Sequence, residues 1–361
     1  MSAEDHAFMA RALRLAERGL CTTTPNPRVG CVVVRDETVV GEGWHERAGE
    51  PHAEVHALRA AGERARGATV YVSLEPCSHQ GRTPPCVDAL IKGGVTRVVA
   101  AMQDPNPRVA GAGLGQLRAA GIATECGVLE AEARELNIGF VSRMTRGRPW
   151  VRMKIAASLD GKTALLNGKS QWITGPDARR DGHRLRARAC AILTGFGTVR
   201  DDDPRLTVRD VETSRQPLRV VVDSRLETPL DAKVLEGGNV LVFAAIAERA
   251  RIAALEQRGA AVIVLANATH KVDLEAMLAE LGRRELNEVH IEAGFKLNGS
   301  LLKAGVVDEL VIYLAPCLLG DAARGLFDLP ALGDLAQRRS LTIRDVRRVG
   351  DDLRIVARFE S

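Results

Sequence analysis

Apolar and polar positions along the first 145 residues recur with spacings that predict helices and strands in turn. Residues 5–19 place apolar side chains on one face of a helix, which Gly19 ends. Residues 29–35 form a nearly continuous apolar strand, and the chain returns through residues 39–40 as a hairpin. The pattern then predicts a helix over 52–62, a strand over 68–74, a helix over 84–92, a strand over 95–101 and a helix over 130–145. This alternation favours a sheet with helices packed on its faces.

The second half of the chain restarts the same alternation after a break. The segment 143–149 is polar and basic, and Gly147 and Pro149 interrupt it, so we place a domain boundary there. A length of 361 residues suits two domains, predicted over 1–146 and 147–361, each large enough for its own core. Strands are predicted at 150–156, 189–194, 218–222, 239–244, 261–265, 288–292 and 308–314, with antiparallel-looking strands near 341–348 and 352–359. We therefore expect two α/β domains.

Composition indicates which kinds of partner the protein binds and in which cell compartment it works. The net charge is +4, from 50 basic and 46 acidic residues, and no polybasic run is present. Seven Phe, three Trp and two Tyr are few for a surface that stacks bases, so we expect neither nucleic acid nor a membrane as a partner. Seven scattered cysteines argue against a disulfide framework. With no signal peptide and no apolar run of about 18–20 residues, the sequence predicts a cytoplasmic protein.

Three side chains in the first half are the kinds of ligand that zinc prefers. His52, Cys77 and Cys86 supply one imidazole and two thiolates, which leaves the fourth tetrahedral position for a water. Zinc lowers the pKa of such a water toward about 7. Glu54 is placed to move protons without being a ligand, and the order His-x-Glu … Pro-Cys is that of zinc deaminases. Eight residues separate the two cysteines here, where the general pattern has two.

The spacing also constrains where these residues lie on their helices. Positions two apart point to nearly opposite sides of a regular helix, so His52 and Glu54 converge only if His52 lies at the non-helical start. Pro51 favours such a boundary. Thr83, Pro84 and Pro85 are predicted as an N-cap and first-turn prolines ahead of Cys86, whose thiolate the helix N-terminus would stabilise.

Other interpretations of these motifs stay open. A closed, structural zinc site would need a fourth ligand, for which His45, His56 and His79 are nearby. His52 and His56 are spaced as in metalloproteases, but Glu54 is not in the glutamate position of that motif. The glycine-rich segment 111–115 lacks the third glycine of a dinucleotide motif, so we predict a turn there.

The blocks 24–31, 49–58, 74–86 and 103–107 resemble the deaminase half of the bifunctional riboflavin-biosynthesis deaminase/reductases. The resemblance implies a cytidine-deaminase-like three-layer α/β/α fold. It favours Asn26 as a substrate contact, although an Asn between two prolines also suits a turn. His79 and Arg82, in the insert between the cysteines, are plausible contacts to polar or phosphorylated substrate groups, or solvated loop residues.

The blocks 154–161, 170–174, 201–209 and 292–294 resemble the reductase half of the same enzymes, whose fold resembles dihydrofolate reductase. The resemblance assigns to the nicotinamide cofactor Ala156, Trp172, Thr198, Asp202, Ser224, Gly294, Phe295, Lys296, Leu297, Asn298, Gly299 and Ser300. It assigns to the sugar-phosphate substrate Lys154, Ser170, Thr174, Arg186, Leu206, Arg209 and Glu292. One departure is that Phe295 and Lys296 stand where a smaller residue is expected.

Several of these residues have a simpler interpretation beside the functional one. Arg186 and Arg209 suit a phosphomonoester, which a guanidinium grips with two hydrogen bonds, but either could be surface charge. Glu292 could hold sugar hydroxyls or cap the following helix. Gly195 and Gly294 each follow a strand, and their backbone amides could approach a phosphate. Arg225 is placed to meet the 2′-phosphate of NADPH.

The resemblance implies a bifunctional enzyme of riboflavin synthesis, with one Zn²⁺ per chain and NADPH as cofactors. Zinc hydroxide would hydrolyse the 2-amino group of 2,5-diamino-6-(5-phosphoribosylamino)pyrimidin-4(3H)-one, and NADPH would then reduce the ribosyl side chain to ribityl. The partner is a small-molecule phosphoribosyl-pyrimidine, and a homo-oligomer is possible. A nucleic-acid base deaminase would need a basic, aromatic groove. A zinc-scaffolded binding module would need neither Glu54 nor the second domain.

Overall fold

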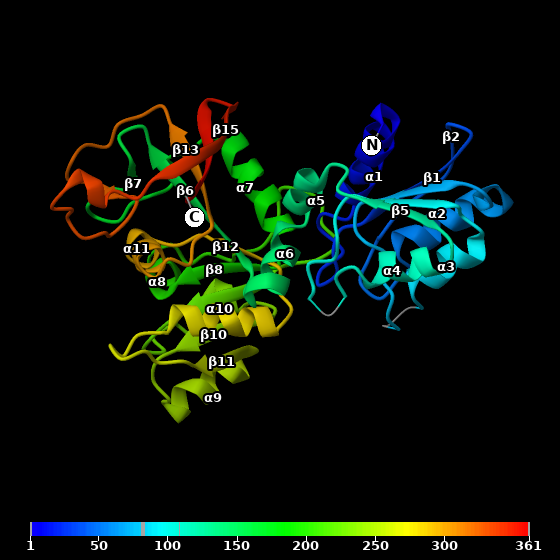
Figure 1. The fold of residues 1–361 in the computed structure, drawn as a ribbon. Coiled ribbons are helices and arrows are strands. Elements are labelled where there is room, and N and C mark those ends of the chain that lie inside the picture. The colour runs from blue at the N-terminus through cyan, green and yellow to red at the C-terminus, as the bar shows by residue number, and fades with distance from the viewer. Residues whose placement is uncertain (1, 81–83, 108, 360–361) are drawn as a thin grey trace. The chain divides into compact units, whose positions relative to one another are not determined.

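The computed structural model describes residues 2–80, 84–107 and 109–359 (Figure 1). They form two compact units, residues 1–147 and 148–361. Each unit has its own sheet and its own hydrophobic core.

Unit 1 is built around a five-stranded sheet with the strand order β2-β1-β3-β4-β5. Strand β1 pairs antiparallel with β2 and β3, and β3, β4 and β5 are parallel. The elements are α1 Ala3–Glu17, β1 Gly30–Arg35, β2 Thr38–Trp44, α2 Ala53–Ala61, a 3-10 helix Gly62–Ala65, β3 Thr69–Val72, α3 Cys86–Gly93, β4 Arg97–Ala100, α4 Ala112–Ala119, β5 Ala123–Cys126, α5 Glu130–Leu136 and α6 Ile138–Arg146. The hairpin and the alternation of helices and strands that the sequence predicts are present.

Glycines in β1 and β2 show that helices cover both faces of this sheet. A Cβ on Gly30 would lie 2.0 Å from the Ala12 carbonyl oxygen, so α1 packs directly on that face. A Cβ on Gly43 would lie 2.6 Å from the Ala53 carbonyl oxygen, so α2 packs equally closely. Gly43 pairs with Cys31, and adjacent residues of a strand point to opposite faces, so α1 and α2 lie on opposite sides. The result is a three-layer α/β/α unit in which the missing side chain at Gly43 of β2 lets α2 pack close to the sheet.

Two helical segments of unit 1 differ from the prediction. The helix expected over 130–145 is divided at Asn137 into α5 and α6. The backbone of Asn137, with φ −103° and ψ 20°, departs from the helix. Its buried side chain accepts from Arg28 N at 2.8 Å and donates to Arg28 O at 2.9 Å. The turn predicted over 111–115 is wrong, because the chain continues from Gly111 into helix α4.

Unit 2 contains a nine-stranded sheet with the order β11-β10-β9-β8-β12-β6-β13-β16-β15. The strands from β11 to β13 are parallel, and β16 and β15 complete the sheet in antiparallel pairs. The strands of this sheet are β6 Trp150–Ser158, β8 Ala191–Gly195, β9 Leu218–Val222, β10 Val240–Ala244, β11 Ala260–Val264, β12 Glu288–Ile291, β13 Glu309–Ala315, β15 Leu341–Val349 and β16 Asp352–Phe359. Two short strands, β7 Lys162–Ala164 and β14 Arg324–Gly325, pair in a separate two-stranded sheet. Its α-helices are α7 Pro176–Arg188, α8 Phe196–Asp202, α9 Arg249–Gln257, α10 Leu274–Arg283 and α11 Phe295–Lys303, with 3-10 turns Lys233–Leu235 and Leu335–Gln337.

A buried ion network links three central strands of this sheet. Arg152 of β6 donates to Glu309 of β13 and, at 3.0 Å, to Glu288 of β12. Arg188 and Arg358 complete the pairing of these carboxylates at 2.7 and 2.8 Å. Removing one member would leave a buried charge without its partner, so the network fixes these strands relative to one another.

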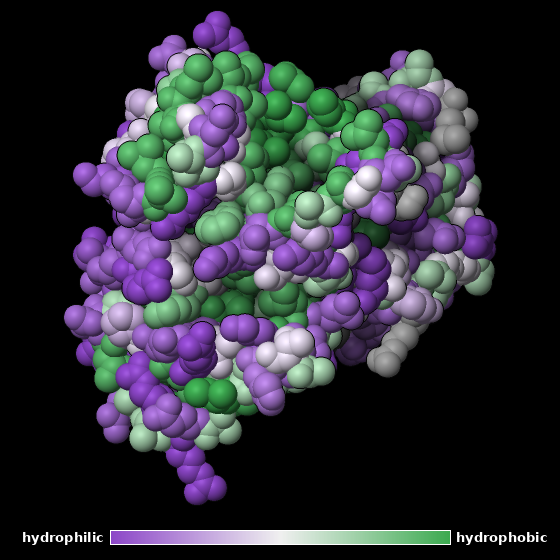
Figure 2. Space-filling view, turned by 90° about the vertical axis from the view of Figure 1, so that its left-hand side faces the viewer, coloured by the Kyte–Doolittle hydropathy of each residue, from purple (hydrophilic) through white to green (hydrophobic). Residues whose placement is uncertain are grey.

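Exposed apolar side chains of unit 2 gather in two segments, residues 159–172 and 318–353. They include Leu166, Leu318, Leu335, Ile343 and Val346, and Figure 2 shows apolar surface over the upper part of the view. β15 is the last strand in the sheet order, so its outer edge has no partner strand within the described chain. No helix among the described residues is both long and apolar enough to cross a bilayer.

Candidate active sites

The three expected zinc ligands of unit 1 converge. His52 Nδ1 lies 3.2 Å from Cys86 Sγ and 3.5 Å from Cys77 Sγ. A tetrahedral zinc with bonds of about 2.0 Å to nitrogen and about 2.3 Å to sulfur separates these atoms by about 3.5 Å. In the part of the chain that the structure describes, these residues form the one group of three or more His, Cys, Asp or Glu whose ligand atoms fit a metal ion. The donor set and its spacing therefore fit zinc.

Two of the expected ligands lie at helix starts, and the third lies in the segment that follows a strand. His52 is the N-cap of α2 with an extended backbone, as the spacing with Glu54 requires. Cys77 follows β3, and Cys86 is the first residue of α3. The amide of Cys86 donates to Cys77 Sγ at 3.3 Å. Hydrogen bonds from the Cys86 thiol, His52 and this amide lower the pKa of Cys77, which favours the thiolate that zinc binds.

The predicted start of α3 is wrong in detail. Pro85, with φ −57° and ψ 136°, is the N-cap, so the prolines precede the helix. The residue before a proline is driven to an extended backbone, which keeps Pro84 out of the first turn. Thr83 and Arg82 lie outside the described residues.

Glu54 lies in the first turn of α2 and is buried. Its Oε2 atom has no hydrogen-bond partner among the described residues. Burial, and then the nearby Cys77, raise the pKa of Glu54 to about 7. A carboxyl group with a pKa near neutrality can both accept and donate a proton, which is the requirement for a general acid–base group.

His45 holds Asn26 and does not join the metal cluster. His45 Nδ1 lies 3.2 Å from the Pro51 carbonyl oxygen, and its Nε2 lies 3.0 Å from Asn26 Nδ2. Since a carbonyl oxygen only accepts, Nδ1 carries the proton and Nε2 accepts from the Asn26 amide. Burial lowers the pKa of His45 to about 4, so the ring is neutral at pH 7. Sequence reasoning missed this contact, because it considered His45 only as a fourth ligand.

The two other histidines offered as a fourth ligand are also outside the described cluster. His79 is exposed. His56 has a buried Nε2 without a hydrogen-bond partner among the described residues. The arrangement favours three protein ligands and an open fourth position.

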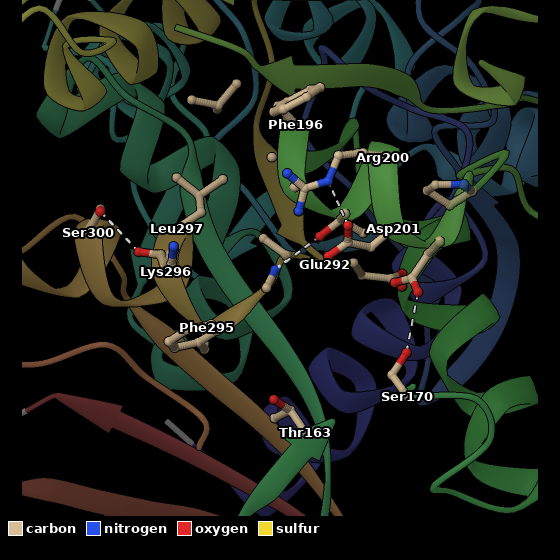
Figure 3. A pocket seen from close by; sticks show the side chains of 18 of the residues that line it. Thr163, Ser170, Phe196, Arg200, Asp201, Glu292, Phe295, Lys296, Leu297 and Ser300 are labelled. Carbon is tan, nitrogen blue, oxygen red and sulfur yellow. Dashed lines mark hydrogen bonds and ion pairs between the residues drawn. The ribbon is translucent and has the colours of Figure 1, made fainter. Parts of the chain in front are cut away.

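In unit 2 a cavity of about 1640 Å³ lies at the carboxyl ends of the parallel strands. Phe196 and Arg200 of α8, Thr163 of β7, and Phe295, Lys296, Leu297 and Ser300 of α11 surround it (Figure 3). Single small-molecule pockets usually measure about 300–1,000 Å³, so this cavity has room for two ligands. Among its lining are all the expected substrate residues of this unit, Lys154, Ser170, Thr174, Arg186, Leu206, Arg209 and Glu292.

Most of the expected cofactor residues line the cavity as well: Ala156, Trp172, Thr198, Asp202, Ser224, Gly294, Phe295, Lys296, Leu297 and Ser300. Asn298 and Gly299 are not in its lining. Asn298 is buried and donates to the Ala293 carbonyl oxygen at 3.1 Å. A Cβ on Gly299 would lie 2.2 Å from the Asp328 carbonyl oxygen, so this side of α11 packs into the unit. Residues between 267 and 275, a loop and the first turn of α10, also line the cavity, and no sequence motif indicated them.

Arg186 and Glu292 form a buried pair in the cavity wall. Nε of Arg186 lies 2.5 Å from Oε1 and Nη2 lies 2.8 Å from Oε2, while Nη1 donates to the Thr207 carbonyl oxygen. Although burial opposes it, the Arg186 charge holds the pKa of Glu292 well below its usual range. The two-point grip on a phosphate suggested for Arg186 is therefore already used by Glu292. Arg209 is exposed, with Nη1 on Thr207 Oγ1, and has further donors for an anion.

Two helix starts and one lysine complete the lining. Gly195 and Gly294 are the N-caps of α8 and α11, and Thr198 Oγ1 accepts from Gly294 N at 3.1 Å, so the two helix starts lie together. Lys154 Nζ lies 5.7 Å from the centre of the Tyr313 ring and has no carboxylate within 4 Å among the described residues. Burial lowers the pKa of Lys154. Arg225 is exposed, with its Nε 3.7 Å from Glu227.

Comparison with known proteins shows which family combines these two sites. Residues 2–102 match the cytidine and deoxycytidylate deaminase zinc-binding region, and residues 149–355 match the RibD C-terminal domain. The riboflavin biosynthesis protein RibD of Escherichia coli K12 is 52% identical, over 97% of this chain and 98% of that protein. The chain belongs to the RibD family.

Solved RibD structures agree over nearly the whole length. The RibD of Acinetobacter baumannii, form 1, is 44% identical, with 99% of both chains covered and a TM-score of 0.92. A diaminohydroxyphosphoribosylaminopyrimidine deaminase/5-amino-6-(5-phosphoribosylamino)uracil reductase from Thermotoga maritima is 34% identical, with 99% of both chains covered and a TM-score of 0.85. The chain is thus a bifunctional deaminase and reductase of riboflavin biosynthesis. The fold class, the enzyme class and the cofactor pair of zinc and NADPH that the sequence predicts are confirmed.

Proposed function

We propose that residues 1–146 carry the deaminase and residues 147–361 the reductase. The first substrate would be 2,5-diamino-6-(5-phosphoribosylamino)pyrimidin-4(3H)-one. The observation that carries the deaminase half is the convergence of His52, Cys77 and Cys86 beside a buried Glu54 oxygen that has no partner among the described residues. The division of the chain into units 1–147 and 148–361 supports the boundary.

In the deaminase site, His52, Cys77 and Cys86 would hold zinc. When bound, zinc supplies Lewis acidity that makes water a nucleophile near pH 7. Glu54 takes the proton of that water as it attacks C2 of the pyrimidine. Glu54 passes this proton to the adjacent ring nitrogen. It then takes the second proton, from the hydroxyl now on C2, and delivers it to the 2-amino group, which leaves as ammonia while C2 becomes a carbonyl carbon. The side-chain NH₂ of Asn26 donates to His45, so its carbonyl oxygen is oriented to accept from an N–H of the pyrimidine ring.

In the reductase site, the cavity holds the cofactor beside the sugar phosphate. NADPH, when bound, supplies the hydride for C1 of the ribosyl group. The bond from C1 to the ring oxygen breaks, and that oxygen needs a proton. Lys154 is the proton donor that we assign, because its ammonium faces the cavity and its lowered pKa makes proton release easier. The helix starts at Gly195 and Gly294 suit the anionic phosphates.

Unit 2 also supports the proposal of a homo-oligomer. Edge strand β15 exposes Ile343 and Val346, and large exposed apolar surfaces often form contacts between proteins. Sedimentation equilibrium of the full chain should give a mass above that of one chain, and Ile343→Lys should lower it. A monomer at micromolar concentration would refute this proposal.

A cytoplasmic location and the absence of nucleic-acid and membrane partners remain predictions.

Replacing Glu54 with Gln tests the proton transfer. Gln keeps the size of the side chain but cannot accept the proton, so ammonia release should fall by about 10²–10⁴-fold. Zinc content should stay at one per chain, because Glu54 is not a ligand. The reductase step should persist when the deaminated intermediate is supplied. Glu50→Gln, an exposed change four residues away, is the matched control. Deamination by Glu54→Gln within a few-fold of the parent would make Glu54 a structural residue.

Replacing Lys154 with Met tests the reductase assignment. Met preserves the apolar stem and removes the proton, so the NADPH oxidation rate at saturating substrate should fall by about 10²–10⁴-fold. Binding of NADPH, measured by titration calorimetry, and ammonia release should stay near the parent values. Lys162→Met, at a lysine whose Nζ lies 3.2 Å from the Asp321 carbonyl oxygen, is the control. A Lys154→Met enzyme that turns over normally would place the proton donor elsewhere.

A further inference from the structure

Glu75 is a buried carboxylate two residues before the ligand Cys77. Its side chain accepts four backbone N–H groups. Oε2 lies 3.1 Å from Asp104 N and 2.9 Å from Gly111 N, and Oε1 lies 2.9 Å from Gly113 N and 3.2 Å from Leu114 N. Nothing in the proposed deamination uses this carboxylate as a ligand or as a proton carrier.

Three of these four donors belong to the start of α4. A helix leaves its first N–H groups without partners inside the helix, and a side chain at the N-cap usually satisfies one of them. The N-cap of α4 is Gly111, which has no side chain to do so. Glu75 supplies the missing acceptors from 36 to 39 residues away in sequence. Its negative charge also lies at the positive end of the helix dipole.

The start of α4 also packs tightly against Pro76, the residue between Glu75 and Cys77. A Cβ on Gly113 would lie 2.0 Å from the Pro76 carbonyl oxygen, so only glycine permits the observed approach. The backbone of Glu75 is held as well, since its N–H donates to the Met102 carbonyl oxygen at 2.9 Å. The segment that leads to Cys77 is therefore fixed by hydrogen bonds through Glu75 and by direct contact at Pro76.

We propose that Glu75 is a positioning residue for the zinc ligand Cys77: by anchoring the start of α4, it holds the sulfur where His52 and Cys86 can share a metal ion with it. The proposal rests on the assignment of these three residues to zinc. Without the carboxylate, four N–H groups would lack this acceptor, and two of them, on Gly113 and Leu114, are buried. The chain between β3 and α4 would then move to satisfy them. Groups that orient metal ligands typically contribute about 10–100-fold to metal affinity.

The direct test measures zinc affinity in the full chain by competition with a chromophoric chelator, with zinc as the only added ligand. Glu75→Gln keeps one acceptor oxygen but turns an NH₂ group toward two N–H donors. The dissociation constant for zinc should rise by about 10–100-fold. Ammonia release should recover when zinc is raised to saturation, and reductase turnover should match the parent. Recovery by zinc separates a role at the metal from a general loss of folding.

Two further variants make the comparison specific. Gly113→Ala leaves Glu75 intact and pushes the Pro76 carbonyl directly, so it should weaken zinc binding in the same way. Asp5→Asn is the matched control, because Asp5 is an equally buried carboxylate of unit 1 that accepts from Ser2 N, Tyr71 and Arg97, away from the ligands. It should lower the melting temperature and leave zinc affinity unchanged.

Parent-like zinc affinity in Glu75→Gln would overturn the proposal. If that variant does not fold, parent-like affinity in Gly113→Ala would overturn it. Equal losses of affinity in Asp5→Asn and Glu75→Gln would also contradict it, because the effect would then follow general destabilisation. A separate variant, Cys77→Ala with Cys86→Ala, tests the underlying assignment. Retention of zinc by this double variant would refute the metal site itself, whatever the result for Glu75.

Discussion

The deaminase half depends on three ligand-bearing segments that end at one edge of a buried sheet. Two of the three expected ligands lie at helix starts, His52 at α2 and Cys86 at α3, where backbone N–H groups point outward and favour thiolate and carboxylate charge. Close packing sets these positions, since Gly41 and Gly43 of β2 admit α2 to the sheet and so place His52 and Glu54. A larger residue at either glycine would displace the helix that supplies both groups.

In the reductase half, the direction of the parallel strands brings the site residues together. Strands β6, β8, β9 and β12 run in one direction, so Lys154, Gly195, Ser224 and Glu292 come to one cavity from distant parts of the sequence. Ligands in such sheets bind at the carboxyl ends of the strands. The Arg152 network links β12, β6 and β13, the central strands of this sheet, and so helps to hold them in register.

Local sequence signals predicted the helix starts and strands that depend on residues close together in the chain. Pro51 before His52 gave the start of α2, and apolar periodicity gave nearly all strands. Features that depend on distant partners could not be predicted. Helix α4 was missed because its capping group, Glu75, lies 36 residues before Gly111. The side chain of Asn137, where α5 gives way to α6, is paired with the backbone of Arg28, 109 residues away. The pairing of Arg186 with Glu292 spans 106 residues, and it changes the role expected of the arginine.

We propose that two thiolates and one imidazole hold the zinc, with one position open to solvent. X-ray absorption at the zinc edge of the purified full chain measures this coordination directly. We expect two sulfur atoms at about 2.3 Å, one imidazole nitrogen and one further light atom at about 2.0 Å. Imidazole rings give a distinct outer-shell signal, so a single ring should be seen. Two imidazoles, or a third sulfur, would show a closed structural site and contradict the account.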